Sequence, residues 1–227
     1  MYKWIDSTKN FIGGECPHKC SYCYVSKSRF PIVKERYYGK IRLLVNEFKK
    51  PLGRNKTIFI CDCNDMWADK VPRKFITDIL WFCNQYPENT YLFQTKNPKR
   101  FYEFPVCLYP PKFILGVTIE TNRDYETNDA PKRKQRMVWM KGFKNQRKTV
   151  TIEPIMSFDI KELTRWIKEI NPEFVSIGGD SKKCGLIEPP KDKIIALIKE
   201  LKKFTIVKEK DNLKRLIDTK GYRIKKL

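Results

Sequence analysis

Three closely spaced cysteines are the residues of this chain best suited to chemistry. Cys16, Cys20 and Cys23 lie in the run Cys-Pro-His-Lys-Cys-Ser-Tyr-Cys and have the spacing C-x3-C-x2-C. Three thiolates at this spacing can hold three corners of a four-iron cluster and leave the fourth iron open. An open iron can bind and reduce a cofactor or substrate, whereas electron carriers use four cysteines. The spacing therefore predicts a reactive [4Fe-4S] centre.

A structural zinc site is the alternative for the same region. Such a site needs four ligands, and Cys20 and Cys23 could supply them together with Cys61 and Cys63. This arrangement leaves Cys16 unused, and Cys61 ends an apolar run that predicts a buried strand. A disulfide framework is disfavoured, because no secretory apolar segment follows Met1 and the 8 cysteines are spread unevenly. We therefore expect a cytoplasmic protein with reduced thiols and favour the iron cluster over zinc.

Length and charge suggest the kind of partner. The 227 residues with 41% hydrophobic content can form one globular domain over residues 1–227, and no stretch is apolar enough to predict a membrane span. The 47 Lys and Arg against 26 Asp and Glu give a formal net charge of +21, which attracts phosphate polyanions. The basic run 132–136 precedes Met137-Val138-Trp139, which suggests charge concentrated beside aromatics. We expect nucleic acid or another phosphate-rich partner; charges spread over solvated faces are the alternative.

Apolar β-branched or aromatic runs alternate with amphipathic stretches along the chain, which is typical of βα units around a parallel sheet. The pattern predicts strands at Thr8–Gly13, Thr57–Cys61, Thr90–Gln94, Phe113–Ile119, Lys148–Ile152 and Glu173–Ile177, and helices at Lys34–Lys49, from Pro72, from Pro98, at Lys132–Lys141, Asp159–Ile170 and Pro190–Lys203. A short strand at Phe204–Val207 and a terminal helix follow. We expect an α/β fold, a partial TIM-like (β/α)6 barrel with the cysteine loop after the first strand and a short C-terminal extension.

Such a barrel gathers its functional residues at the carboxyl ends of its strands. Polar and glycine residues follow the predicted strands at these points: Asp62, Asn64, Asp65, Lys96, Glu120, Glu153, Gly178, Gly179 and Lys208. Any one of them can be an ordinary turn or helix cap. The set as a whole predicts a polar rim around the cysteine loop.

The cysteine spacing, with the aromatic Tyr22 before the third cysteine, resembles the signature of the radical S-adenosylmethionine (SAM) superfamily. In that superfamily the open iron binds the amino and carboxylate groups of SAM, and an electron splits SAM into methionine and a 5′-deoxyadenosyl radical. The radical then takes a hydrogen atom from the substrate. The resemblance implies a [4Fe-4S] cluster and SAM as cofactors and a reductant protein of the flavodoxin or ferredoxin type.

Further segments resemble the phage-associated Gp37/Gp68-type family: Asp65-Met66-Trp67 with Val71-Pro72, residues 93–100, residues 116–120, Ile152-Glu153-Pro154 and residues 176–180. The cysteine loop is also similar to that of spore photoproduct lyase and its relatives, which act on DNA. This chain is shorter than the lyase pattern, and none of its cysteines matches the hydrogen-donating cysteine of the lyase. Cys61 and Cys63 stand where the phage family more often has small or polar residues, and Cys63 is a candidate hydrogen-atom donor.

These considerations assign expected roles. Cys16, Cys20 and Cys23 are the predicted metal ligands; Tyr22, Asp65, Glu120, Glu153, Gly178 and Gly179 are predicted to bind cofactor; Cys63, Lys96 and Lys208 are the predicted catalytic residues. Carboxylates can accept bonds from the SAM ribose, a lysine can pair with its carboxylate, and glycine permits close backbone approach. His18 is expected either to contact the cluster or to shape the loop. The resemblance implies modification or repair of nucleic acid; the alternatives are a zinc-containing nucleic-acid-binding protein and a radical activator of a partner protein.

Overall fold

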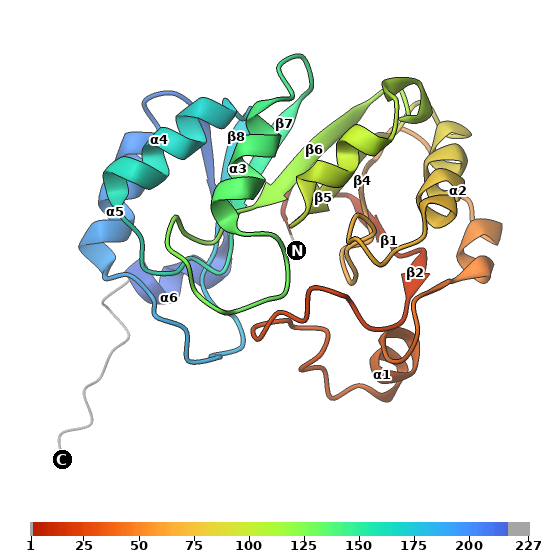
Figure 1. Ribbon diagram of the computed structural model, residues 1–227, viewed down its shortest axis with the longest axis horizontal. Coiled ribbons are helices and arrows are strands. Elements are labelled where there is room, and N and C mark those ends of the chain that lie inside the picture. The colour runs from red at the N-terminus through yellow and green to blue at the C-terminus, as the bar shows by residue number, and fades with distance from the viewer. Residues whose placement is uncertain (1, 218–227) are drawn as a thin grey trace.

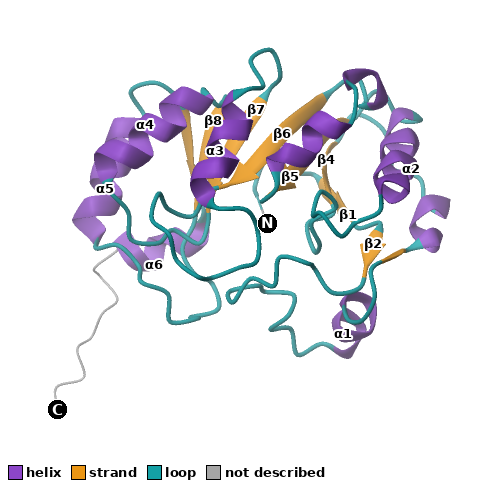
Figure 2. Ribbon diagram, viewed as in Figure 1, coloured by secondary structure: helices purple, strands orange, loops and turns teal. Residues whose placement is uncertain are grey.

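A parallel sheet of seven strands forms the centre of the protein, for which the computed structural model describes residues 2–217. The strands are β1 (Ser7–Lys9), β4 (Thr57–Ile60), β5 (Thr90–Thr95), β6 (Phe113–Thr118), β7 (Lys148–Ile152), β8 (Phe174–Ile177) and β9 (Ile206–Glu209), in this spatial order. Every neighbouring pair is parallel. The sheet curls into a partial barrel with helices along its outer side (Figures 1 and 2). The predicted partial TIM-like barrel is thereby confirmed.

Helices return the chain between most of these strands. They are α2 (Arg73–Asn84) after β4, α3 (Arg133–Lys141) after β6, α4 (Ile160–Ile170) after β7 and α5 (Lys191–Leu201) after β8, with α6 (Lys214–Ile217) after β9. Between β5 and β6 the chain has only short 3₁₀ helices at Pro98–Glu103 and Val106–Leu108. No helix within residues 2–217 is long and apolar enough to cross a membrane.

Side-chain alternation along the strands separates two apolar clusters. On β8, Val175 and Ile177 belong to the large core that contains the helices' apolar faces, while Phe174 and Ser176 point to the opposite face of the sheet. That inner face carries a small cluster of Tyr2, Ile5, Phe59, Leu92 and Ile114, with Trp4 against it. The start of the described chain therefore fills part of the barrel interior.

The first predicted strand is two separate elements. β1 ends at Lys9, and β2 (Ile12–Gly13) leaves the main sheet and pairs antiparallel with β3 (Arg42–Leu43). Gly14, at φ +88°, lies so close to the Lys40 carbonyl that a Cβ atom there would be 2.2 Å from the oxygen. A glycine is needed at this approach, and the cysteine loop begins directly after it.

The helix predicted at Lys34–Lys49 is wrong. The chain forms α1 (Pro31–Tyr37), then β3, then a 3₁₀ helix at Val45–Lys49. Gly39, at φ +75°, separates α1 from β3. Phe48 packs on Phe11 and Phe82, whereas Val45 is exposed. The apolar spacing that suggested one helix thus arises from two short elements that place different residues in the core.

Candidate functional site

A cavity of about 690 Å³ opens at the carboxyl ends of the strands. Its walls come from the cysteine loop and from the segments after β4, β5, β7, β8 and β9. Among the residues predicted for the site, the lining includes Cys16, Cys20, Cys23, Tyr22, Cys63, Asp65, Lys96, Glu153 and Gly179. Glu120, Gly178 and Lys208 are not among the lining residues. The fold therefore brings most of the predicted residues to one cavity.

A side-chain contact of His18 holds the cysteine loop (residues 16–23) against the strand ends, and we call such a contact a latch. The His18 ring is buried, and its Nε2 atom lies 2.8 Å from Asp65 Oδ2. The same carboxylate accepts bonds from the Thr95 hydroxyl and the Lys96 backbone N–H at the end of β5, and from the Trp67 N–H. Burial by itself would raise the pKa of Asp65, but His18 and these bonds lower it below the ordinary value. Asp65 thus ties the loop to two strand ends, with three of its four hydrogen-bond contacts at Oδ2.

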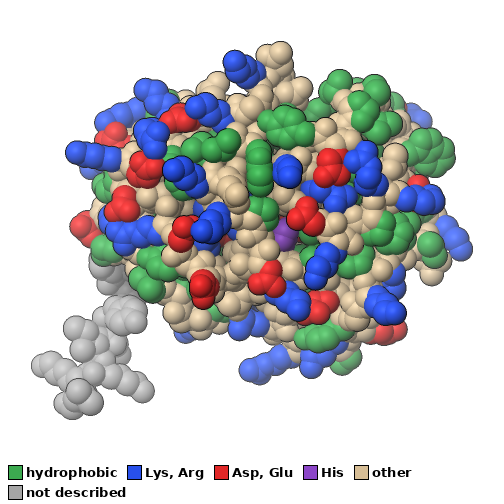
Figure 3. All heavy atoms as spheres, in the orientation of Figure 1, with side chains coloured by type: hydrophobic (Ala, Val, Ile, Leu, Met, Phe, Trp, Pro, Cys, Tyr) green, Lys and Arg blue, Asp and Glu red, His purple; other side chains and the backbone are tan. Residues whose placement is uncertain are grey.

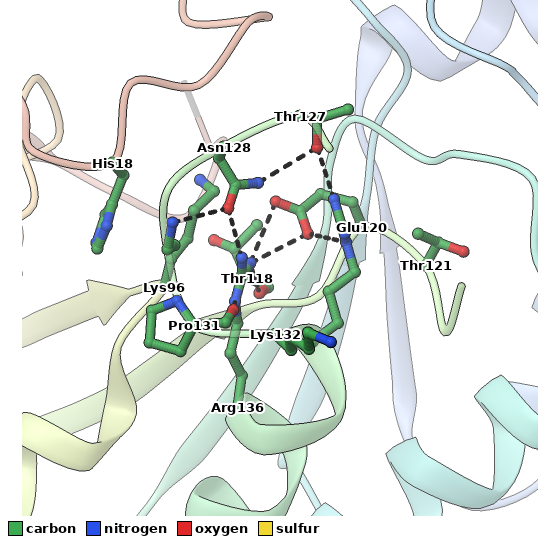
Figure 4. Close-up of polar contacts among 12 residues, drawn as sticks. His18, Lys96, Thr118, Glu120, Thr121, Thr127, Asn128, Pro131, Lys132 and Arg136 are labelled. Atoms are coloured by element: carbon green, nitrogen blue, oxygen red, sulfur yellow. Dashed lines mark hydrogen bonds and ion pairs between the residues drawn. The ribbon is translucent and has the colours of Figure 1, made fainter. Parts of the chain in front are cut away.

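A second latch starts at Tyr22, whose hydroxyl donates a hydrogen bond to Glu120. Glu120 is fully buried and pairs with Arg133 (3.0 Å) and Arg136 (3.2 Å) from α3. Burial opposes its charge, but Arg136, Lys96 and Arg133 lower the pKa of Glu120 to about 2. Figure 4 shows Glu120 facing Arg136, which in turn reaches Asn128 in the loop after β6 (2.8 Å). Glu120 is therefore placed to position the cysteine loop through Tyr22 rather than to line the cavity.

Backbone bonds fasten the cysteine loop to the loop after β6. The Ser21 N–H donates to the Thr127 carbonyl (2.9 Å), and the Asp129 N–H donates to the His18 carbonyl (2.8 Å). In Figure 1 the two loops meet on the open side of the sheet. The three cysteines are consequently carried by a loop that is anchored between each pair of them.

The basic run 132–136 is not a continuous surface patch. Arg133 and Arg136 are 4% and 1% exposed because both turn inward to Glu120. Lys132 and Lys134 remain exposed. On the face drawn in Figure 3, Lys and Arg side chains are scattered among acidic and apolar ones. The structure therefore corrects the expectation of concentrated charge at this run.

Lys96 projects into the cavity close to the cysteine loop. Its ammonium lies 5.5 Å from the centroid of the Tyr22 ring and makes no hydrogen bond or ion pair with another residue in the range 2–217. Burial disfavours the charge, but Cys20 and Glu120 raise the pKa of Lys96 above its ordinary value. A cation of this kind, held beside the cysteines, is suited to receive an anionic group.

Cys63 lies on the same cavity wall with phenol groups around it. The Tyr24 hydroxyl is 3.6 Å from Cys63 Sγ and donates to the Asp62 carboxylate (3.2 Å). Tyr37 lies beside the same thiol. Burial, followed by Asp62, raises the pKa of Cys63, so the thiol stays protonated at neutral pH. Cys61 by contrast is buried, as expected for an apolar thiol.

The opposite wall is built around Glu153. Its carboxylate accepts bonds from Lys210 Nζ (2.6 Å) and Asn212 Nδ2 (2.8 Å). Gly178 provides the room for this pair, since a Cβ atom there would lie 2.7 Å from Glu153 Oε1. Asn212 also exchanges bonds with the backbone of Gly179. The sequence places Lys210 in the polar run after the last strand but gives it no site role, and Asn212 was not predicted, because neither belongs to a clear motif.

Lys208 lies away from this cavity. It faces the inside of the barrel, between the rings of Trp4 (4.6 Å) and Phe174 (3.7 Å). The predicted strand ended at Val207, whereas β9 ends at Glu209, so the rim position moves two residues on to Lys210. The predicted residue, Lys208, and the observed one, Lys210, are two positions apart, which is one full repeat of the pleated strand.

The three cysteines lie in the lining of one cavity, as expected for ligands that hold a single cluster from one side. All three line the open cavity and none is in a disulfide. Burial and Asp65 raise the pKa of Cys16 to about 12, and burial raises that of Cys20, so iron would have to displace their protons. Within residues 2–217, no group of three or more His, Cys, Asp or Glu side chains is arranged to hold a metal ion. In a four-iron cluster each cysteine binds a different iron atom, so the three thiolates need not converge on one ion.

Solved structures with a similar fold include a spore photoproduct lyase double mutant with bound AdoMet and dinucleoside spore photoproduct. The identity is 14% and the TM-score 0.55, over 87% of this chain and 61% of the lyase chain. A single mutant of the lyase gives 11% identity and a TM-score of 0.62, over 88% of this chain and 75% of the other. Streptococcus suis SuiB bound to precursor peptide SuiA gives 9% and 0.61, over 92% and 49%. The fold is thus one found in radical SAM enzymes.

Comparison by sequence adds the family. No curated protein matches the chain. A family model described as a protein of unknown function, DUF5131, matches residues 2–185, which include the cysteine loop and most of the cavity. The Gp37/Gp68 assignment is not among these findings. The chain belongs to the DUF5131 family.

Proposed function

We propose that this protein is a radical SAM enzyme. The observation that carries the proposal is the convergence of Cys16, Cys20 and Cys23 on one open cavity at the carboxyl ends of the strands. The likeness to a lyase with bound AdoMet supports it at the level of the fold. The contacts of His18 with Asp65 and of Tyr22 with Glu120 support the proposal further, because they fix the loop that contains the cysteines.

The three cysteines would hold a [4Fe-4S] cluster, with SAM at the iron that no cysteine occupies. When bound, the cluster and SAM together would supply a 5′-deoxyadenosyl radical, which removes a hydrogen atom from the substrate. Lys96 is the residue we assign to the carboxylate of SAM, because its ammonium lies near Cys20 and is unpaired within the described range. Glu153, held by Lys210 and Asn212, borders the same cavity and is assigned to the hydroxyl groups of a bound ligand.

Asp65 and Glu120 receive different roles from those expected of cofactor-binding residues. Each carboxylate is engaged by several protein donors and contacts the cysteine loop, at His18 and Tyr22 respectively. We assign both as positioning residues for the loop. Their effect on catalysis would then come through the position of the cysteines and not through contact with SAM.

Cys63 is assigned as a hydrogen-atom donor to the substrate radical. Its protonated thiol borders the cavity, and Tyr24 holds it at 3.6 Å. In this step one hydrogen atom passes from sulfur to the substrate carbon, and a thiyl radical remains. One electron from the flavodoxin- or ferredoxin-type reductant and one proton restore the thiol. Tyr24 and Asp62 orient the donor.

We assign nucleic acid as the substrate class. The formal net charge of +21 favours binding of phosphate polyanions. Exposed aromatic residues of the segment 24–38, namely Tyr24, Phe30 and Tyr38 (46%, 70% and 49% exposed), are interleaved with Lys27, Arg29 and Lys34. Aromatic rings next to basic side chains suit stacked bases of a single strand. Tyr24 also borders the cavity, so this segment connects the surface with the reactive site.

A peptide or protein substrate is the second candidate, favoured by the similarity in fold to SuiB bound to its precursor peptide. The same basic segment would then meet acidic side chains. Failure of single-stranded oligonucleotides to bind at the segment 24–38 would favour this candidate.

Anaerobic reconstitution with iron and sulfide tests the proposed function. We expect about four irons per chain, an iron–sulfur absorption spectrum and, after reduction with dithionite, 5′-deoxyadenosine from added SAM. Cys20→Ala should lose the iron and the product. Cys107→Ala is the matched control, because Cys107 is an exposed thiol away from the cavity, and it should retain both. A colourless protein with one zinc and no 5′-deoxyadenosine would overturn the proposal in favour of a zinc-containing binding protein.

A further inference from the structure

A second, smaller cavity of about 280 Å³ lies between the start of the described chain and the last strand. It is lined by Tyr2, Lys3, Trp4, Ser176 and residues 208–211. Ser176 on β8 and Lys208 on β9 are register partners, so their side chains share the inner face of the sheet. The cavity adjoins the main one through Tyr2, Lys210 and Asp211. None of the three cluster cysteines borders it.

Every charged lining side chain except one has an oppositely charged partner among the described residues. Lys3 pairs with Asp211 (2.9 Å), Glu209 with Lys202 (3.2 Å), and Lys210 with Glu153 (2.6 Å). Lys208 makes no hydrogen bond or ion pair within residues 2–217 and only contacts the faces of Trp4 and Phe174. Burial lowers the pKa of Lys208, although the charge of Glu173, which forms no ion pair with it in the described residues, acts in the opposite direction. Among the described residues, Lys208 is therefore the one charged lining residue without a direct ion-pair partner.

Two further lining groups lack a hydrogen-bond partner. Trp4 Nε1 and Ser176 Oγ are both buried and unpaired in the described part of the chain. Leaving a buried polar group unpaired costs free energy. The indole N–H and the lysine ammonium can only donate, and the serine hydroxyl can donate as well. The group that completes this cavity must therefore accept hydrogen bonds, and next to Lys208 it is best suited if negatively charged.

We propose that this cavity is an oxyanion-binding site, in which Lys208 supplies the charge and Ser176 and Trp4 supply hydrogen bonds. The chemical class is a phosphate or a similar small oxyanion, either free or as part of a nucleic acid backbone. The site does not depend on the proposed radical chemistry, because its donors are separate from the cysteines and from Lys96. It gives a role to a lysine that the main cavity leaves unused.

Titration with inorganic phosphate, monitored by the indole signals in a ¹H–¹⁵N spectrum, tests the site. The chain has five tryptophans, and Trp4→Phe identifies the signal of Trp4 by its loss. Phosphate, added at constant ionic strength against chloride, should shift this signal saturably. A site that holds only water would leave it unmoved, and that result would overturn the proposal.

Variants make the test specific. Lys208→Met should weaken phosphate binding about tenfold or more, as expected for a charge-assisted bond, and Ser176→Ala should weaken it about threefold. Lys199→Met, which removes an equal charge from an exposed position on α5 outside both cavities, should bind as the wild type does. Equal binding by the Lys208, Ser176 and Lys199 variants, each with an otherwise native spectrum, would contradict a specific site.

The source of the oxyanion follows from a second titration with a short single-stranded oligonucleotide. If the oligonucleotide shifts the Trp4 signal and competes with inorganic phosphate, the site takes a backbone phosphate. If only inorganic phosphate shifts it, the site takes a small free oxyanion. Neither titration requires the cluster or SAM, so the outcome is independent of the radical reaction.

Discussion

Asp65 joins the cysteine loop to the ends of two strands. Its carboxylate forms hydrogen bonds of 2.8–3.0 Å with four residues, namely His18, Thr95, Lys96 and Trp67. Such a group is expected to be costly to alter, because a buried carboxylate with several donors leaves those donors unpaired when it is changed. The position of the cysteines depends on the same contacts.

We therefore expect Asp65→Asn to lower the free energy of unfolding by about 3 kcal/mol. An amide cannot accept at both of its positions, so at least one donor is left without a partner. Urea denaturation measures the stability, and the iron content after reconstitution should fall as the loop loses its latch. Asp78→Asn is the control, since Asp78 forms an exposed pair with Lys74, and it should change stability by less than about 1 kcal/mol. Equal effects of the two substitutions would show that Asp65 is not a latch.

At the scale of elements, the segment between β2 and β3 contains both the cysteine loop and the residues proposed to bind the substrate. It begins with the cysteine loop and continues through the exposed aromatic and basic residues of the segment 24–38. β2 and β3 close its base by antiparallel pairing, which keeps both parts at the mouth of the barrel. In contrast, α3 uses Arg133 and Arg136 internally, so its basic character contributes less to the surface than its sequence suggests.

The substrate proposal can be tested by substitutions in this segment between β2 and β3. Phe30→Ala should weaken binding of a labelled single-stranded oligonucleotide about fivefold through loss of stacking. Lys27→Met should reduce the slope of the logarithm of the binding constant against the logarithm of the salt concentration by about one. Fluorescence anisotropy at several salt concentrations measures both effects. Val138→Ala and Lys134→Met change exposed residues of α3 and serve as controls; weakening by these to the same extent would indicate that binding is spread over the whole surface.

At the scale of the whole molecule, Glu47 links the segment between β2 and β3 to β1, the first strand of the sheet. It pairs with Lys9 (3.1 Å), Arg36 (3.1 Å) and Lys50 (2.9 Å). Burial opposes its charge, but hydrogen bonds from Lys50 and Lys9 and the charge of Arg36 lower the pKa of Glu47 from 4.5 to about 2. A lowered pKa stabilises the folded state above the unfolded pKa, and this contribution is lost as the pH falls through the folded value.

Glu47→Gln should therefore lower the free energy of unfolding by about 1–2 kcal/mol at pH 7, allowing for screening by solvent. The difference from wild type should shrink between pH 4.5 and pH 2, because the wild-type carboxylate then becomes protonated as well. Urea denaturation at several pH values in this range measures the trend. Glu35→Gln alters an exposed residue of α1 and should show little difference at any pH. A constant difference for Glu47→Gln down to pH 2 would contradict the role of its charge.

The features that follow from local sequence were predictable. The cysteine spacing is contained in eight consecutive residues, and strands such as β4, β5 and β7 follow from short apolar runs. The alternation of strands and helices also implied a partial barrel with its functional residues at one end. The convergence of the cysteines, Cys63, Lys96 and Glu153 on one cavity follows from that topology.

Tertiary structure decided which charged residues face the cavity. Tyr22 and Glu120 are 98 positions apart, and His18 and Asp65 are 47 apart, so no local pattern could reveal that these carboxylates hold the loop. The inward turn of Arg133 and Arg136 likewise depends on a buried acid from another element. The last strand ends two residues later than its apolar run suggests, which puts Lys210 at the cavity and Lys208 in a second one. Sequence by itself determined which chemistry is proposed, because that proposal rests on three cysteines close together in the chain. The fold settled the partners of each charge, because these partners come from distant strands.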